Sequence, residues 1–224
     1  MTVATNLADV RARIDRAARA AGRDPASVRL VAVSKTKPAE LVREAYAAGQ
    51  RAFGENYAQE LAEKAATLRD LPDLTWHFIG HLQSNKAKLV APTAALIHAV
   101  DKADLAEALV RKAGGRPLRC LIEVNVGLEA QKHGVLPDQV AALASRLSAM
   151  PGLTLEGLMC LPPAGQPAGP FFTALHGLRD TLRAQLGLPL PELSMGMSED
   201  FELAIAAGAT LVRVGTAIFG ERSA

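Results

Sequence analysis

The sequence has few cysteines, few aromatic residues and no block of charge of one sign, and each shortage narrows the class of protein. Cys120 and Cys160 are the only cysteines among 224 residues. They have neither the Cys-x-x-Cys spacing of redox and zinc motifs nor the density of a secreted disulfide scaffold. Both lie in expected strands, so we predict two buried free thiols in a reducing compartment.

Charge and hydropathy disfavour two further classes. The net charge is +2, from 25 Lys and Arg against 23 Asp and Glu spread along the chain, and aromatic residues make up 4%. A nucleic-acid-binding protein usually carries a basic patch, so we expect no nucleic-acid partner. No apolar run approaches the roughly 18 residues that span a bilayer, and the N-terminus does not resemble a signal peptide. We therefore expect a cytoplasmic protein with no membrane partner.

Hydrophobic residues are abundant, at 49% of the chain, and they fall into alternating strand and helix patterns. Short runs rich in β-branched residues predict strands at 28–33, 51–55, 75–79, 96–100, 118–126, 153–159, 192–195 and 210–214. Helical patterns follow them at 38–48, 56–68, 82–90, 102–113 with Asp101 as cap, 137–149, 171–185, from Ser198 to 207, and in a short turn after Gly215. An amphipathic helix over 5–21, capped by Gly22, precedes the first strand.

Eight strands, each followed by a helix or helical turn, are typical of a (β/α)8 TIM barrel, which usually has about 250 residues. The main alternative is a doubly wound open sheet. Against it, the first strand lacks a Gly-x-Gly-x-x-Gly turn, and Ser34-Lys35-Thr36-Lys37 has no glycine of a Walker loop. We predict one α/β domain over residues 1–224, a (β/α)8 barrel with an additional N-terminal helix. Segment 161–170, rich in Pro and Gly, is expected to be an extended rim loop.

The candidate site lies at the carboxyl ends of the first and last strands, where barrels bind their ligands. Lys35 ends the first strand, and strands one and eight are neighbours in a closed barrel. Ser198 is expected to cap a helix, and Gly215 and Thr216 open a helical turn whose backbone N–H groups can hold a phosphate. With the guanidinium of Arg213, these groups match the aldehyde, phosphate and ring nitrogen of pyridoxal 5'-phosphate (PLP).

Several stretches resemble the pyridoxal phosphate homeostasis protein family, whose barrel is similar to the N-terminal domain of alanine racemase. They are 32–38 (AVSKTKP), 53–57 (FGENY), 76–86 (WHFIGHLQSNK), 157–159 (GLM), 194–198 (SMGMS) and 212–220 (VRVGTAIFG). The resemblance covers nearly the whole chain and implies a PLP fold type III barrel. It also implies a protein that buffers PLP inside the cell and delivers it to PLP-dependent apo-enzymes. We expect it to be a monomer.

The resemblance implies a role for each matched residue and no metal ligand or catalytic residue. Lys35 forms the Schiff base with PLP, Asn56 lies near the ring, and Arg213 faces the pyridine nitrogen. The phosphate is held by Ser198, Gly215 and Thr216. Cys160 and the proline-rich loop 161–170 depart from the family pattern, which affects only the shape of the rim.

A carrier role competes with two other hypotheses. Alanine racemase uses a second domain, which supplies a tyrosine as second base across its dimer. The present sequence ends after its eighth unit, and only Tyr57 is placed to reach the rim, so a non-catalytic role is favoured. The alternative is a low-activity PLP-dependent amino-acid racemase or lyase. A third hypothesis is a partner-binding role for helix 5–21, although such helices more often pack against their own barrel.

Three further features do not decide between these hypotheses. His77 and His81 fall in a strand and the following loop, not on one helix face, so we interpret them as rim or packing residues and not as a metal pair. Glu123 and Asn125 share a face of the fifth strand and are expected to point into the barrel. The role of the Lys132-His133-Gly134 loop stays open.

Overall fold

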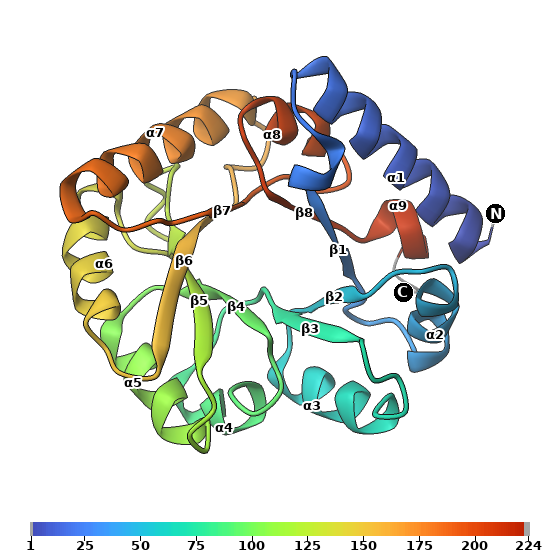
Figure 1. Cartoon of the computed structure of the whole chain (residues 1–224), viewed down its shortest axis with the longest axis horizontal. Helices are drawn as coiled ribbons and strands as arrows, with labels where there is room; N and C mark the ends of the chain where they lie inside the picture. The colour runs from blue at the N-terminus through green and yellow to red at the C-terminus, as the bar shows by residue number, and fades with distance from the viewer. Residues whose placement is uncertain (1, 222–224) are drawn as a thin grey trace.

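A computed structural model describes residues 2–221, whose eight parallel strands close into a barrel. The strands follow one another around the ring in chain order, and β8 pairs with β1 to close it. Figure 1 shows the strands as an inner ring that the helices surround. The predicted (β/α)8 barrel with an extra N-terminal helix is therefore confirmed. The strands are β1 Arg29–Val33, β2 Ala52–Glu55, β3 Thr75–Phe78, β4 Leu96–Val100, β5 Leu118–Val124, β6 Leu153–Cys160, β7 Glu192–Ser194 and β8 Leu211–Val214.

The helices lie close to their predicted positions. They are α1 Val3–Ala20, α2 Ala39–Ala47, α3 Ala58–Thr67, α4 Ala87–Val90, α5 Ala103–Lys112, α6 Val140–Ser148, α7 Gly169–Leu186, α8 Phe201–Ala206 and α9 Thr216–Phe219. Three single turns of 3-10 helix accompany them: η1 Pro25–Ser27, η2 Ser84–Lys86 and η3 Pro137–Gln139. No helix within residues 2–221 has both the length and the apolar character needed to cross a membrane.

Two sequence predictions about helix ends were wrong. The rim loop stops at residue 168, because Gly169 and Pro170 form the first turn of α7. Proline is compatible with that position, where its missing N–H has no partner in any case. Asp101 does not cap α5; the N-cap position belongs to Lys102, whose side chain makes no capping bond.

Helix α1 packs against the outside of the barrel. Its apolar stripe (Val3, Leu7, Val10, Ile14 and Ala18) is buried, and the helix contacts α2, α8 and α9. The N–H of Arg23 donates to the Ala18 carbonyl at 2.9 Å, while Gly22 adopts φ 67°. This is a Schellman end, in which glycine accepts the left-handed conformation without strain. The apolar face of α1 is therefore used within the chain, as the packing interpretation of this helix predicts.

The barrel interior contains both apolar and polar side chains. An apolar cluster fills part of the interior with Val31, Leu96, Ala99, Leu121, Met159 and Leu211. Buried polar side chains also lie on the strands, among them His77, His98, Glu123, Ser194 and Arg213. Cys120 and Cys160 are buried free thiols, as predicted, and burial raises the pKa of each to about 12.

Candidate functional site

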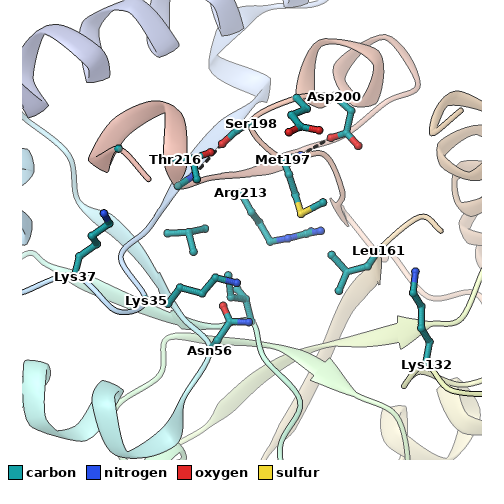
Figure 2. A pocket seen from close by; sticks show the side chains of 15 residues that line it. Lys35, Lys37, Asn56, Lys132, Leu161, Met197, Ser198, Asp200, Arg213 and Thr216 are labelled. Carbon is teal, nitrogen blue, oxygen red and sulfur yellow. Dashed lines mark hydrogen bonds between the residues drawn. The ribbon is translucent and has the colours of Figure 1, made fainter. Parts of the chain in front are cut away.

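A cavity of about 480 Å³ opens at the carboxyl end of the barrel beside β1 and β8. This size falls within the roughly 300–1,000 Å³ of small-molecule sites. Its lining includes all six site residues predicted from sequence: Lys35, Asn56, Ser198, Arg213, Gly215 and Thr216. Figure 2 shows Lys35 and Arg213 pointing into the cavity, with Ser198 and Thr216 together at one end. Closure of the barrel has therefore brought residues from segments 35–56 and 198–216, which are far apart in the sequence, to one site.

Lys35 lies in a tight turn that directly follows β1. The Ser34 N–H donates to the Gly54 carbonyl at 3.0 Å, so pairing with β2 continues up to the residue before the lysine. Thr36 has φ 60°, an uncommon conformation for a β-branched residue. Its N–H donates to Glu60 Oε1 at 2.6 Å, which holds the turn. The direction in which Lys35 leaves the rim is thereby set by its neighbours on both sides.

A buried ion cluster supports the end of β1. Lys64 Nζ donates to the Ser34 carbonyl at 2.6 Å, to Glu55 Oε1 at 2.8 Å and to Glu60 Oε1 at 2.7 Å. The side chains of Lys64 and Glu55 are 8% and 0% exposed. Burial raises the pKa of Glu55 to about 7, although hydrogen bonds from Lys64 and Ser34 lower it. The cluster joins α3 to β1 and β2 next to Lys35.

Asn56 lines the cavity, and its side chain carries an unsatisfied acceptor. Its Oδ1 is buried and has no hydrogen-bond partner among residues 2–221. Leaving a buried polar group unpaired costs about 1–3 kcal/mol, so a donor on a ligand would be favourable here. Gly80 makes the position possible, because a Cβ there would lie 2.2 Å from the Asn56 carbonyl oxygen. Only glycine lets the end of β3 approach so closely.

The Ser198 hydroxyl faces the turn between β8 and α9. Ser198 Oγ lies 3.4 Å from the backbone nitrogen of Gly215 and 3.5 Å from that of Ala217, and accepts a long hydrogen bond from each. A Cβ at Gly215 would lie 3.1 Å from the Val33 carbonyl, so glycine allows this turn to pack against the end of β1. Ser198, Gly215 and Thr216 thus form a small polar recess at one end of the cavity.

The predicted capping role of Ser198 was wrong. Helix α8 begins at Phe201, and the N-cap position belongs to Asp200. The Asp200 carboxylate accepts a 2.6 Å hydrogen bond from the Met197 N–H, which shapes the loop before the helix. Because Ser198 is not used as a cap, its hydroxyl turns to the β8–α9 turn.

Arg213 is held rigidly inside the barrel. Its side chain is buried, and it donates from Nη1 to Ser194 Oγ at 2.6 Å and from Nη2 to the Cys160 carbonyl at 2.9 Å. These partners come from β7 and β6, so three neighbouring strands fix the guanidinium. Burial lowers the pKa of Arg213, yet a guanidinium remains charged in proteins. The cavity therefore contains one permanently positive group in a fixed position.

Two neutral histidines continue this chain of hydrogen bonds. Ser194 Oγ lies 2.8 Å from His98 Nδ1, and His98 Nε2 lies 2.9 Å from His77 Nδ1. Arg213 donates to the Ser194 hydroxyl, so one hydrogen-bonded chain runs from the guanidinium through Ser194 and His98 to His77. Burial lowers the pKa of His77 to about 3 and that of His98 well below its usual value. Both rings are therefore neutral at neutral pH.

The sequence reasoning missed His98. A histidine in the middle of the apolar strand Leu-Ile-His-Ala-Val was the available signal. The sequence predicted that His77 and His81 are rim or packing residues. His77 is a buried packing residue inside the barrel, and His81 is an exposed residue on the rim. Tyr57 is 56% exposed and does not line the cavity.

Glu123 is a buried carboxyl group near Arg213. Its Oε2 has no hydrogen-bond partner among residues 2–221. Burial and the charge of Asp101 raise the pKa of Glu123 to about 7, against the lowering effect of Arg213. Asn125 is also buried, but its side chain bonds to the loop that follows, donating to the Glu129 carbonyl at 2.9 Å. Glu123, at the end of β5, is therefore able to change charge near neutral pH.

Glu123→Gln is expected to weaken the pH dependence of stability. The pKa in the folded protein is about 7, against 4.5 for a glutamate side chain in water. The contribution of Glu123 is therefore fully present below pH 4.5 and is lost as the pH rises through 7, by about 1–3 kcal/mol. Urea unfolding of both proteins at pH 5 and pH 8 measures it. The variant should gain relative stability at pH 8; an equal difference at both pH values would contradict the raised pKa.

Comparison with known proteins places the chain among barrel proteins. Residues 5–223 match the family model described as alanine racemase, N-terminal domain. A pyridoxal phosphate homeostasis protein of Pseudomonas aeruginosa is 52% identical over 223 residues, covering 99% of this chain and 96% of the relative. A protein of the same name from Aquifex aeolicus is 43% identical over 227 residues, covering 99% of each chain.

Solved structures agree with this result. PipY of Synechococcus elongatus, in a structure with PLP bound, is 42% identical with a TM-score of 0.86, covering 98% of this chain and 100% of that one. Alanine racemase of Corynebacterium glutamicum is 21% identical with a TM-score of 0.72, covering 99% of this chain and 61% of that one. The second similarity concerns the fold alone.

Proposed function

Because the chain belongs to the pyridoxal phosphate homeostasis protein family, we propose that it binds PLP in the cavity beside β1 and β8 and serves PLP homeostasis. The observation that carries the proposal is the convergence of all six predicted residues on one cavity. The name of the Pseudomonas relative and the PLP in the PipY structure support it. The protein buffers the cofactor and delivers it to PLP-dependent apo-enzymes.

The residues present fit this cofactor. Lys35 supplies an amine for the PLP aldehyde, which it holds as a Schiff base. Ser198, Gly215 and Thr216 form a recess for the phosphate, where the long bonds from Gly215 and Ala217 to Ser198 Oγ leave N–H groups for a stronger acceptor. The orphaned Oδ1 of Asn56 takes a donor near the ring.

Arg213 determines what the bound cofactor can do. PLP supplies an electron-withdrawing pyridinium ring when its nitrogen is protonated. Arg213 is a fixed cation with no acceptor, so it donates to a neutral pyridine nitrogen and does not keep a proton there. The Ser194 hydroxyl and the Cys160 carbonyl hold the guanidinium in that orientation. The arrangement favours retention of the cofactor over carbanion chemistry.

The remaining parts of the proposal concern the state of the protein in the cell. One barrel accounts for residues 2–221, which supports a single-domain organisation. The closed sheet offers no unpaired strand edge among these residues, which favours a monomer. Two buried free thiols suit the reducing cytoplasm.

Borohydride trapping tests the proposal. Purified protein is incubated with PLP, its visible absorbance is recorded, and the sample is reduced with borohydride before peptide mapping. We expect new absorbance that disappears on reduction and one pyridoxyl group on Lys35. The Lys35→Ala protein should carry no adduct, because Lys37 and Lys132, which also line the cavity, donate to the Glu221 and Pro162 carbonyls.

Lys37→Ala provides the matched control. Lys37 also lines the cavity, but its Nζ donates to the Glu221 carbonyl, so its removal should leave the adduct intact. An adduct on Lys37, or none on wild type, would refute the assignment of Lys35. Steady conversion of one amino-acid enantiomer by wild type, abolished in Lys35→Ala, would instead replace the carrier role with a racemase.

A further inference from the structure

Three residues with metal-binding side chains meet at the barrel rim, outside the PLP cavity. His81 follows β3, Asp101 directly follows β4, and His133 lies in the loop after β5. One ligand atom from each side chain lies within 4.8 Å of the others. None of the three lines the cavity that contains Lys35. The cluster is therefore separate from the groups assigned to PLP.

The imidazole rings of His81 and His133 lie face to face. They stack with centroids 3.5 Å apart and an interplanar angle of 8°. A neutral imidazole has a free nitrogen lone pair, which is the form that binds a metal ion. The stack thus brings two side chains that can bind a metal ion next to each other.

Asp101 completes the cluster with an unsatisfied carboxylate. Its Oδ1 is buried and accepts no hydrogen bond within residues 2–221. One oxygen of the carboxylate lies within 4.8 Å of a ring nitrogen of each histidine. A cation held by these ring nitrogens and the carboxylate would compensate the charge of Asp101, whose buried oxygen has no partner among the described residues.

The fold explains why His133 is held at this place. Gly134 has φ 103°, and a Cβ there would lie 2.8 Å from the Asn125 backbone nitrogen. Glycine thus lets the loop return against β5, where the Val135 N–H donates to the Glu123 carbonyl at 2.8 Å. The short step from Gly134 to His133 then places the imidazole over the ends of β3 and β4. In the Lys132-His133-Gly134 loop, the glycine therefore allows the turn that positions the histidine.

We propose that His81, Asp101 and His133 form a binding site for a divalent transition-metal ion of the zinc class. Two imidazole nitrogens and one carboxylate oxygen are a donor set that zinc accepts, with the fourth position left to water or another ligand. Ligand atoms in a tetrahedral zinc site are about 3.3 Å apart, which follows from bonds of about 2.0–2.1 Å. Both histidines are exposed, so their rings are free to turn out of the stack, which is needed to direct both lone pairs at one ion.

Zinc binding by the untagged, PLP-free protein tests this site. The protein is titrated with Zn²⁺ against a chromogenic chelator, and separately with Co²⁺, whose visible absorption reports coordination number. We expect one Zn²⁺ per chain and a four-coordinate Co²⁺ spectrum. His81→Ala, His133→Ala and Asp101→Asn should each weaken zinc binding at least 10-fold.

His176→Ala is the matched control. His176 is a partly exposed histidine whose Nε2 lies 3.1 Å from an Asp180 oxygen, so it represents an ordinary surface His–Asp pair. Its removal should leave zinc binding unchanged. Absence of stoichiometric binding, or equal affinity in all variants, would refute the proposal. Circular dichroism checks folding; if Asp101→Asn fails to fold, the two exposed histidines still decide the result.

Discussion

Lys64→Met is expected to destabilise the protein by about 3–5 kcal/mol, because it leaves Glu55 buried without its cation. Lys64 Nζ makes three hydrogen bonds below the Lys35 turn, and the Glu55 side chain is fully buried. For a chain of this size, such a loss lowers Tm by roughly 6–20 °C. The same change frees the end of β1, so PLP capture by Lys35 should also weaken.

The pH dependence separates this cause from lost packing. The pKa of Glu55 is already raised to about 7, and removing Lys64 raises it further. The contribution of Glu55 is present below pH 4.5 and is lost as the pH rises through the folded pKa, so the loss in Lys64→Met should be larger at pH 8 than at pH 5. Urea unfolding at both values measures it. A loss independent of pH would contradict the charge explanation.

Two control variants accompany Lys64→Met. Glu55→Gln/Lys64→Met removes both charges and should recover most of the stability. Arg146→Met removes a surface cation that lies 3.1 Å from Glu107, with side chains 61% and 42% exposed. It should cost less than about 1 kcal/mol, because water solvates both groups.

Gly157→Ala is expected to destabilise the barrel by about 3 kcal/mol or more. Gly157 lies on β6 opposite Glu192 of β7. A Cβ at residue 157 would lie 1.9 Å from the Glu192 carbonyl oxygen and 2.7 Å from its carbonyl carbon. Both atoms belong to the backbone of a closed sheet, so relief requires β6 and β7 to separate. Denaturant unfolding measures the change.

Gly177→Ala is the opposite case and serves as control. Gly177 lies inside α7, and a Cβ there would have no heavy atom within 4 Å. Alanine restricts the unfolded chain and favours the helix, so the variant should gain about 0.5–1 kcal/mol. Equal effects of the two substitutions would show that the strand contact at Gly157 is not the cause.

Much of the fold followed from local patterns. All eight strands were predicted within a few residues, because alternating runs of buried β-branched residues and amphipathic helices have their own periodicities. The position of Lys35 at a strand end, and the neighbourhood of β1 and β8, then placed Arg213, Ser198, Gly215 and Thr216 at one rim. Helix ends were predicted less well. Ser198 and Asp101 were each predicted to cap a helix, but the N-cap positions belong to Asp200 and Lys102.

The sequence by itself determined the barrel, because it depends on periodicity and on strand order. Strand ends placed five of the six cavity residues, and the family resemblance supplied Asn56. Only the tertiary structure decided the contact between His77 and His98, the burial of Lys64 with Glu55, and the meeting of His81 with His133. These features depend on which side chains from separate strands and loops face one another. Distance through space, and the loss of water on burial, are properties that no local spacing contains.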